Sequence, residues 1–406
     1  MSLEKIYLFL IIVLTGTVYA AFWSNIILAI SILVLAYLFL KDKETKYEVN
    51  LLVTYAGLTL LIGLILLGHY IVVPLGNDPI PYLTLCFRFA VIGLFFIYIK
   101  NKTIDFSYLL QSVLKWIAYH ATIGFILSFF IIGFIFNLNS ENFHSNTFLY
   151  LFFYNSNFNV LGISVYRNQG IFWEPGILQI YMNILFFISS FIIRNKRLQF
   201  LSAFLVLTTY STTGIGILLL QLLVILFSGK SSVVQKILLF LMLSTVAVPI
   251  FILNYKEKVN DDSATDQTSS AFRIYDLLEG VKITTQYPLT GIGLSEDTYK
   301  AVKNANNSFF TSYSQDFTNI VLDRRSSNSI MFFLTRFGIP FTLCCFIVLY
   351  RQTYIRQKKW LFFLIIILSN LSEPLLTSPF FVLIATSGFY SLIKLKINTF
   401  PKPKMA

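Results

Sequence analysis

Two side chains that could carry chemistry stand between strongly apolar stretches, in the sequence RNQGIFWEPG at residues 167 to 176. Arg167 keeps its charge and presents a planar fork of donors, which suits two-point binding of phosphate oxygens. Glu174 could orient that arginine or accept a proton from a hydroxyl group. Two simpler interpretations stay open. Arg167 could only reach lipid phosphates, and Glu174 could only cap the helix that Pro175 begins.

A second set of arginines could bind the same kind of anion. Arg273 lies on an amphipathic stretch, and Arg324 and Arg325 come just before an apolar run. Arg88 and Arg336 stand inside apolar runs, where a charge is costly, so each is expected to face a polar cavity or to snorkel to the surface. An exposed position on the helix stays open for Arg273, as does ordinary membrane flanking for the pair at 324 and 325.

The elements that position these residues are predicted to be membrane helices. Of the 406 residues, 56% are hydrophobic and 12% charged, and the mean hydropathy is +0.72. Apolar runs of about 16 to 25 residues recur from end to end, each long enough to cross a bilayer or nearly so. We therefore expect an all-α integral membrane protein with about twelve spans, folded as one polytopic domain over residues 1–406.

The net charge of +12 could indicate a nucleic-acid partner, but the basic residues lie mostly in short connectors between apolar runs. If the N-terminus is inside, most of them fall on the inner side, and the short outer connectors hold only Arg167. By the positive-inside rule this asymmetry predicts that both termini are cytoplasmic. The basic charge is then a signal of topology, and no nucleic acid is expected.

Two outer segments, 137–174 and 255–327, are long enough to carry chemistry. The first contains FLYLFFY, which is too short to span a bilayer and is expected to lie in the interface or to re-enter the membrane. The second contains an amphipathic helix, with Phe272, Tyr275, Leu278 and Ile283 as its apolar stripe, and then a stretch rich in aromatics and amides. That composition fits a sugar-binding surface as well as an ordinary polar loop. The cysteines fall within spans and show no metal-ligand spacing.

Five short motifs follow one another along the chain: RNQGIFWEP from Arg167, STTG from Ser211, YPLTGIG from Tyr287, SSNSI from Ser326 and FGIP from Phe337. Their order and sidedness resemble the O-antigen polymerase (Wzy) family, within the O-antigen polymerase/ligase superfamily. The resemblance implies a GT-C glycosyltransferase of the inner membrane that needs no metal or other cofactor. It would join undecaprenyl-pyrophosphate-linked repeat units on the periplasmic face and release undecaprenyl pyrophosphate. It also implies a possible partner, a chain-length regulator.

Arg167 and Arg273 match arginine positions of the family pattern, which makes them the expected clamp on the leaving pyrophosphate, with Glu174 as the third catalytic candidate. The ligases carry a histidine ahead of Asn-Ser, where this chain has Ser327. This departure argues against a ligase and leaves the base open. Asp323 and Glu296 are further candidates for the base, and His144 is a weaker one. The expected substrate contacts are Asn168, Arg88, Arg324, Arg325, Asn328 and Arg336.

Three alternatives remain. A ligase transferring glycan to lipid A core and a capsule polymerase are close in chemistry. A flippase of lipid-linked oligosaccharide would also need many spans and buried arginines, but such transporters show two similar halves. This chain shows no convincing internal repeat, and the long segment at 255–327 favours an enzyme.

Overall fold

The computed structural model describes residues 2–41, 49–73, 75, 78–131, 134–140, 143–160, 163–228, 234, 269–306 and 328–399. The chain forms two compact units. The first combines Met1–Val34, Phe106–Asp266 and Gln357–Glu373. The second combines Leu35–Asp105, Gln267–Arg356 and Pro374–Ala406. Each unit is thus assembled from three separate stretches of the sequence.

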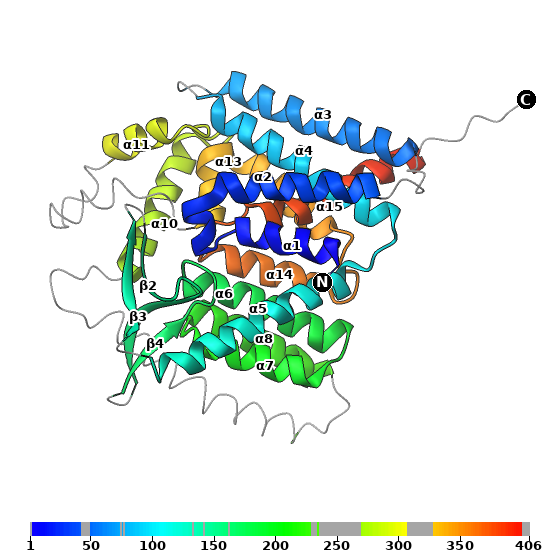
Figure 1. Cartoon of the computed structure of the whole chain (residues 1–406). Coiled ribbons are helices and arrows are strands. Elements are labelled where there is room, and N and C mark those ends of the chain that lie inside the picture. The colour runs from blue at the N-terminus through cyan, green and yellow to red at the C-terminus, as the bar shows by residue number, and fades with distance from the viewer. Residues whose placement is uncertain are drawn as a thin grey trace, which may run out of the picture. The chain divides into compact units, whose positions relative to one another are not determined.

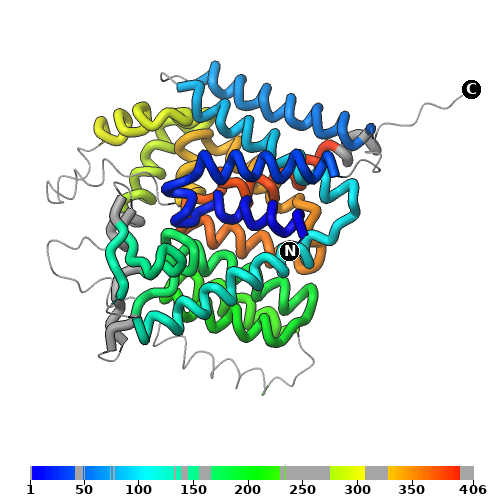
Figure 2. Tube along the Cα trace, in the orientation of Figure 1, coloured from blue at the N-terminus to red at the C-terminus, as the bar shows by residue number. Residues whose placement is uncertain are grey.

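The first unit is built around helix α6. Nearly every residue of this helix is buried, including the polar Gln179 and Asn183. It packs against α7, α8 and α14, while α5 packs against α1, α6 and α7, and Figures 1 and 2 show α5 to α8 running side by side. The helices of this unit are α1 (Leu3–Leu14), the first part of α2 (Val18–Lys41), α5 (Phe106–Ser128), α6 (Pro175–Phe187) with the π-helix η2 (Ile188–Ile192), α7 (Lys196–Thr208), α8 (Thr212–Ser228) and α14 (Lys359–Asn370).

A four-stranded antiparallel sheet, in the order β1-β2-β3-β4, forms most of the first outer segment. Its strands are β1 (Phe136–Ser140), β2 (Phe143–Phe148), β3 (Phe152–Val160) and β4 (Ile163–Asn168). These strands are not evident from the sequence, because Asn and Ser, which are frequent here, are rarely favoured in strands. The FLYLFFY run divides at Leu149 and Tyr150, whose φ angles of 54° and 55° make the turn between β2 and β3.

The turn between β2 and β3 lies beside α5 well before the end of that helix. His120 Nε2 donates to the carbonyl of Leu151 at 3.0 Å, and the Tyr19 hydroxyl donates to the carbonyl of Tyr150 at 3.1 Å. Because His120 precedes the last residue of α5, Ser128, by two turns, the tip lies about 12 Å along the helix from its end. Side chains thus bond to both carbonyls of the turn. The position of this run in the interface or as a re-entrant segment stays a prediction.

Among its described residues, the second unit has four long helices and two shorter ones. Helices α3 and α4 pack together, α15 contacts α3, α4 and α13, and α10 packs on α13. Its helices are α3 (Val49–Val72), α4 (Ile80–Asn101), α10 (Ser269–Gln286), α11 (Glu296–Ala305), α13 (Ser329–Arg351) and α15 (Pro379–Thr399), drawn in Figure 1. A small core of Ile283, Ile292 and Tyr299 joins α10, α11 and the loop between them.

Helix α13 is broken where the FGIP motif places a glycine and a proline. Gly338 has a φ of 78°, and Pro340 cannot donate a backbone hydrogen bond. The YPLTGIG loop supplies partners at the break, because the carbonyl of Thr335 accepts from Ile292 N at 2.9 Å and the carbonyl of Pro288 accepts from Ile339 N at 2.8 Å. The YPLTGIG and FGIP motifs, which are about fifty residues apart in the sequence, are therefore joined by backbone hydrogen bonds.

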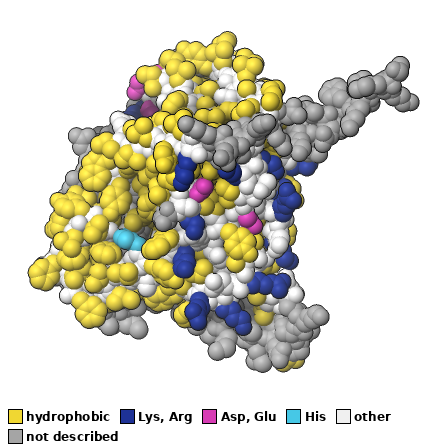
Figure 3. Space-filling model, turned by 45° about the vertical axis from the view of Figure 1, so that its right-hand side comes forward, with side chains coloured by type: hydrophobic (Ala, Val, Ile, Leu, Met, Phe, Trp, Pro, Cys, Tyr) yellow, Lys and Arg dark blue, Asp and Glu magenta, His cyan; other side chains and the backbone are white. Residues whose placement is uncertain are grey.

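Within the described residues, five helices are long and apolar enough to cross a membrane, and three further apolar helices are shorter. This is a multi-pass, mostly helical architecture, and hydrophobic side chains cover much of the face drawn in Figure 3. The expectation of about twelve spans is not confirmed, partly because a further apolar run, at residues 234–254, lies almost wholly outside the described residues. The five long helices are Val18–Lys41, Leu51–Val72, Ile80–Asn101, Pro175–Ile192 and Ser329–Arg351.

Candidate functional site

The RNQG segment at the end of β4 is attached to two helices of the first unit. Arg167 is half-buried, and its Nε donates to the carbonyl of Thr209 at 3.2 Å, just after the end of α7. The buried Asn168 donates from Nδ2 to the carbonyl of Ala121 on α5 at 3.2 Å and to Thr208 Oγ1 at 3.0 Å. These bonds fix the position of the arginine relative to the connector between α7 and α8.

The amide of Asn168 also shapes its own turn. Its Oδ1 accepts from the backbone N–H of Gly170 at 3.1 Å, and Gly170 has a φ of 60°, a conformation that favours glycine. Because protein partners engage both ends of this amide, Asn168 holds the segment in place. The expected substrate contact of Asn168 therefore has no support in its geometry.

The residues between Gly170 and Glu174 are held by the turn between α1 and α2. Thr17 and Phe172 form an isolated antiparallel bridge, and Trp173 N donates to the carbonyl of Gly16 at 3.2 Å. The Phe172 ring is fully buried and stacks on Tyr181 of α6 with 5.0 Å between the ring centroids. The whole stretch from Arg167 to the start of α6 is thus anchored at several points.

The carboxylate that lies against the start of α6 belongs to Glu373, which follows α14. Glu174 is the N-cap residue, as the capping interpretation expects, but its exposed side chain makes no capping hydrogen bond. A Cβ added to Gly176 would lie 1.8 Å from Glu373 Oε1, which places the Glu373 carboxylate against the first turn of α6. A negative charge is stabilised at that end of a helix. Glu373 is only 2% exposed.

Below this carboxylate, a chain of amides joins α6 to α8. Asn183 Nδ2 donates to Gln179 Oε1 at 3.0 Å and to the carbonyl of Gly214 at 3.1 Å, and Gln221 Nε2 donates to Asn183 Oδ1 at 2.9 Å. All three amide side chains are fully buried. Buried amides that bond across helices specify how those helices pack in a membrane. They fix the STTG hairpin at the start of α8 relative to the Glu-Pro-Gly start of α6.

Arg336 of the second unit is committed to protein partners. Its guanidinium forms an ion pair with Glu296 Oε2 at 3.0 Å, donates to the carbonyls of Gly293 and Ser295, and lies 4.4 Å from the centroid of the Tyr299 ring. The residue is 2% exposed. Arg336 therefore ties α13 to the YPLTGIG loop and the start of α11. The geometry gives no support to its expected contact with substrate, and it gives Glu296 a structural partner.

Two other expected substrate contacts also make structural bonds within the second unit. Arg88 Nη1 donates to the carbonyl of Thr377 at 3.2 Å, which links α4 to the segment before α15. Asn328 is the N-cap of α13, where its Oδ1 accepts from Ile330 N at 2.8 Å and from Met331 N at 3.3 Å. An Asn N-cap is a common way to satisfy the first N–H groups of a helix.

A buried ion pair between α10 and α11 was not predicted. Lys303 Nζ lies 3.6 Å from Glu279 Oε2, and the two side chains are 0% and 1% exposed. Lys303 Nζ also lies 5.5 Å from the centroids of the Tyr275 and Tyr299 rings. Burial raises the pKa of the Glu279 carboxyl to about 7, although the nearby Lys303 opposes the rise.

The signal for this pair was present in the helix periodicity. Tyr275, Glu279 and Ile283 follow one another at steps of four, so a charged residue occupies the apolar face of α10. The predicted stripe used Leu278 instead, which is 45% exposed. A carboxylate at a core position requires a buried partner, and that requirement points to a cation on a neighbouring helix.

Several candidates cannot be placed. Residues 323 to 325, which include Arg324, Arg325 and Asp323, lie outside the described residues, as do the side chains of Arg273 on α10 and His144 on β2. Arg167 belongs to the first unit and Arg273 to the second, and each is described within its own unit. Among the described residues, no group of three or more His, Cys, Asp or Glu side chains could hold a metal ion.

Residues 198–346 match the sequence model of a family described as O-antigen ligase. The match supports the O-antigen polymerase/ligase superfamily. It begins in α7 and ends in α13, so it includes Thr209, the STTG hairpin, Arg273 and the YPLTGIG and FGIP motifs. No curated protein matches the chain. The superfamily fits a membrane protein of O-antigen or lipopolysaccharide biosynthesis, and the match does not separate polymerases from ligases.

Proposed function

We propose that this protein is an O-antigen polymerase of the Wzy type that joins lipid-linked repeat units on the periplasmic face of the inner membrane. A hydroxyl oxygen of one undecaprenyl-pyrophosphate-linked unit attacks the anomeric carbon of the glycan on another. The bond between that carbon and the pyrophosphate oxygen breaks, and undecaprenyl pyrophosphate leaves with the electron pair. The hydroxyl proton passes to a base. The chain therefore grows by one unit for each pyrophosphate released.

The position of Arg167 carries the proposal. Its guanidinium is bonded to the carbonyl of Thr209 at 3.2 Å, and Thr209 lies inside the segment that matches the O-antigen ligase family. The arginine is half-buried, and the stretch that follows it is anchored to α1, α2 and α6. A fixed cation at this place would stabilise the negative charge that develops on the leaving pyrophosphate. Arg273, also within the matched segment, is proposed as the second cation.

The residue before Asn328 favours a polymerase over a ligase. The O-antigen ligases that this chain resembles carry a histidine at that position, whereas this chain has Ser327. Glu174 remains the proposed proton acceptor because its side chain is exposed and makes no capping bond, seven residues after Arg167 in the anchored stretch. Glu296 is a weaker candidate because it is paired with Arg336.

The test is a transfer assay with purified protein and a lipid-linked repeat unit as the only substrate, with product length read on a gel. The wild type should give a ladder. Arg167→Ala should lower the rate by roughly 10² to 10³, as does loss of one donor that stabilises transition-state charge. Arg167→Lys should also be impaired, because lysine keeps the charge but cannot bind in two-point geometry.

Arg197→Ala is the matched control, because Arg197 is an exposed arginine in the first turn of α7 and should tolerate the change. Equal ladders from wild type and Arg167→Ala would refute the role of Arg167. A single transfer that occurs only when lipid A core is added would mean a ligase. If wild-type protein transfers to neither acceptor but moves the lipid-linked unit across vesicles, the flippase alternative holds.

A further inference from the structure

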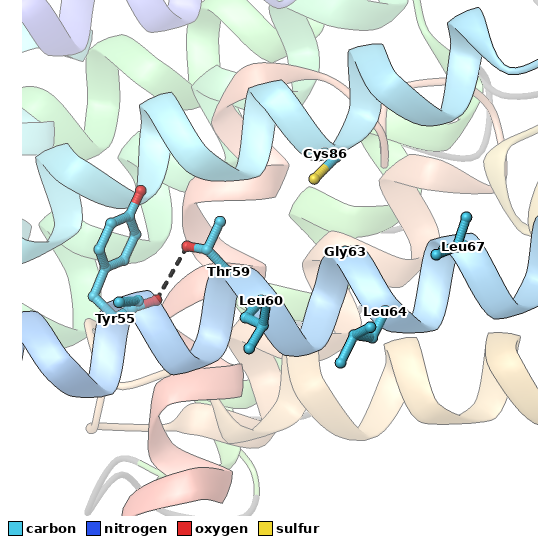
Figure 4. Close-up of a pocket in the computed structure, with 8 residues that line it drawn as sticks. Tyr55, Thr59, Leu60, Gly63, Leu64, Leu67 and Cys86 are labelled. Carbon is cyan, nitrogen blue, oxygen red and sulfur yellow. Dashed lines mark hydrogen bonds between the residues drawn. The ribbon is translucent and has the colours of Figure 1, made fainter.

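Helices α3 and α4 of the second unit are antiparallel neighbours, and their pairing can be followed in Figure 4. Gly63 of α3 faces Cys86 of α4, and a Cβ added to the glycine would lie 3.7 Å from the thiol sulfur. Because the two helices run in opposite directions, the end of α3 meets the start of α4. This pairing brings His69 to Tyr82, with 2.9 Å between the imidazole Nδ1 and the hydroxyl oxygen.

The YPLTGIG loop is bonded to both of these side chains. His69 Nε2 lies 2.7 Å from the carbonyl oxygen of Thr290, and the Tyr82 hydroxyl forms a hydrogen bond with the backbone of Leu294, the residue after the motif. The imidazole ring also packs on Phe337 of α13, with 4.9 Å between the ring centroids. The opposite side of the loop is bonded to the backbone of α13 at the break in that helix. Side chains of α3 and α4 thus hold the loop against α13.

The hydrogen-bond partners specify one state of the imidazole. A carbonyl oxygen can only accept, so Nε2 of His69 must carry the hydrogen that it donates to Thr290. In a neutral ring Nδ1 is then an acceptor, and it takes the hydrogen of the Tyr82 hydroxyl. The Tyr82 oxygen in turn accepts from the N–H of Leu294. The series runs from one end of the loop to the other, and each donor has one acceptor only if His69 is neutral.

A proton added to His69 would disrupt this series of bonds. Nδ1 would become a second donor that faces the Tyr82 oxygen. The hydroxyl hydrogen of Tyr82 would then lose its acceptor, and a polar group that loses its partner inside the protein is costly. Protonation would therefore weaken the contacts that tie α3 and α4 to Thr290 and Leu294.

The charged groups around these bonds would not offset the change. Arg336 of α13 already acts on Tyr82 as a cation, and it pairs at 3.0 Å with the carboxylate of Glu296. A further ionisable neighbour of Tyr82 is the phenol group of Tyr70 on α3. Helix α15, which also contacts α3, has no charged residue from 379 to 393. Among these described groups, a protonated imidazole would meet a second cation and a carboxylate that is already paired.

We propose that neutral His69 is a positioning residue that holds the YPLTGIG loop in place, and that protonation of His69 releases the loop and slows transfer. The effect on transfer rests on the proposed function, because the loop lies in the matched segment between Arg273 and the SSNSI motif. His69 needs no contact with substrate for this role. It is half-buried and stands one turn before the end of α3, so protons can reach it.

The first test is the pH dependence of kcat in the transfer assay, over the interval of about pH 7.5 to pH 5 in which an imidazole takes up its proton. Wild type should lose about tenfold or more of its kcat over this interval. His69→Gln should lose about twofold or less, because the glutamine amide can still donate to Thr290 but does not titrate. An acid loss of wild-type size in His69→Gln would overturn the proposal.

His120→Gln is the matched control. His120 also bonds to a carbonyl, that of Leu151 at 3.0 Å, but it belongs to the first unit and has no printed bond to the loop. Its variant should keep the pH dependence of the wild type. If His120→Gln abolishes the acid loss and His69→Gln does not, the sensing residue is His120 and the proposal is wrong.

Hydrogen exchange of the loop amides, corrected for the intrinsic pH dependence of exchange, tests the contact without any substrate. In wild type, the amides of residues 287 to 294 should exchange about tenfold faster at pH 5 than at pH 7.5 after this correction, and in His69→Gln they should change little. Tyr82→Phe removes the hydroxyl that joins His69 to Leu294. It should show at pH 7.5 the fast exchange of the acidic wild type, and it repeats the test if His69→Gln fails to fold.

The two measurements can fail separately. If wild type transfers no glycan at any pH, the proposed function fails, while hydrogen exchange still decides whether His69 holds the loop. Loop exchange that is independent of pH in folded wild type would overturn the proposal, whatever the transfer assay shows. A loop that loosens in acid while kcat stays constant would overturn the proposed effect of the loop on transfer.

Discussion

The buried Glu279 predicts an unusual dependence of stability on pH in the segment formed by α10 and α11. The pKa of its carboxyl rises from 4.5 to about 7 because burial disfavours the charged form more than Lys303 favours it. A group whose pKa is higher in the folded state binds its proton more tightly there than in the opened chain. Its contribution is therefore fully present below pH 4.5 and is lost as the pH rises through 7.

The size of the effect follows from the two pKa values. A tenfold change in proton affinity corresponds to 1.36 kcal/mol, so the rise from 4.5 to about 7 makes the contribution of Glu279 about 3 kcal/mol at low pH. Most of it should disappear between pH 5 and pH 7.5. Glu279→Gln keeps the shape of the side chain and removes the titration, so its stability should change far less across the same interval.

Hydrogen exchange of the α10 and α11 amides, corrected for the intrinsic pH dependence of exchange, measures the free energy of local opening. Wild-type protein should open more easily at pH 7.5 than at pH 5, and this change in opening free energy should exceed that of Glu279→Gln by about 2 kcal/mol. Asp297→Asn, an exposed change in the first turn of α11, should behave like wild type. If wild type and Glu279→Gln show the same pH slope, or if wild type becomes more stable toward pH 7.5, the burial of an ionisable Glu279 is refuted.

Three further predictions concern positions with tight geometry. Gly176→Ala should displace the Glu373 carboxylate and cost about 1 to 3 kcal/mol in thermal stability, and adding Glu373→Ala should recover part of that loss; strictly additive effects would contradict the contact. Gly291 has a φ of 64°, and a Cβ added there would lie 2.5 Å from the Arg336 carbonyl carbon, so Gly291→Ala should lower the stability of the fold by about 1 to 2 kcal/mol or more. Gly216→Ala is the control, because its Cβ would meet no atom within 4 Å and should leave the stability unchanged. Asn328→Ala should cost about 1 kcal/mol through the lost cap and Asn328→Asp should cost little, so equal losses would point to a role other than capping.

The helices of the membrane could be predicted because their signal is local. A run of about twenty apolar residues identifies a span without knowledge of its neighbours, and α3, α4 and α13 coincide closely with predicted runs. The sheet at 136–168 could not be predicted in the same way, since each strand is held by pairing with its neighbour, as Phe136 pairs with Thr147, and not by a periodicity of its own. Its Asn-rich strands look like loops when the partner strand is unknown.

The sequence identifies the motifs of the candidate site but not the contacts that their residues make. The pairing of FGIP with YPLTGIG depends on where the break in α13 places free carbonyls, which neither motif reveals alone. Glu373 stands before Pro374 as Glu174 stands before Pro175, but its contact with Gly176 depends on the packing of α14 against α6, which the sequence does not reveal. The Glu279 and Lys303 pair was missed because the predicted stripe included the exposed Leu278 in place of the buried Glu279.

The polar residues of the motifs divide into two groups, and the division changes how mutations should be interpreted. Asn168, Asn328 and Arg336 bond chiefly to the protein itself, so a loss of activity on changing them would follow from a displaced turn, cap or loop. Arg167 and Glu174 are different, because one is half-buried at an anchored segment and the other is exposed without a capping bond. Only for this second group should activity fall while hydrogen exchange of the surrounding helices stays unchanged. That combination, measured for Arg167→Ala against Asn168→Ala, separates a residue that contacts substrate from one that holds the site in shape.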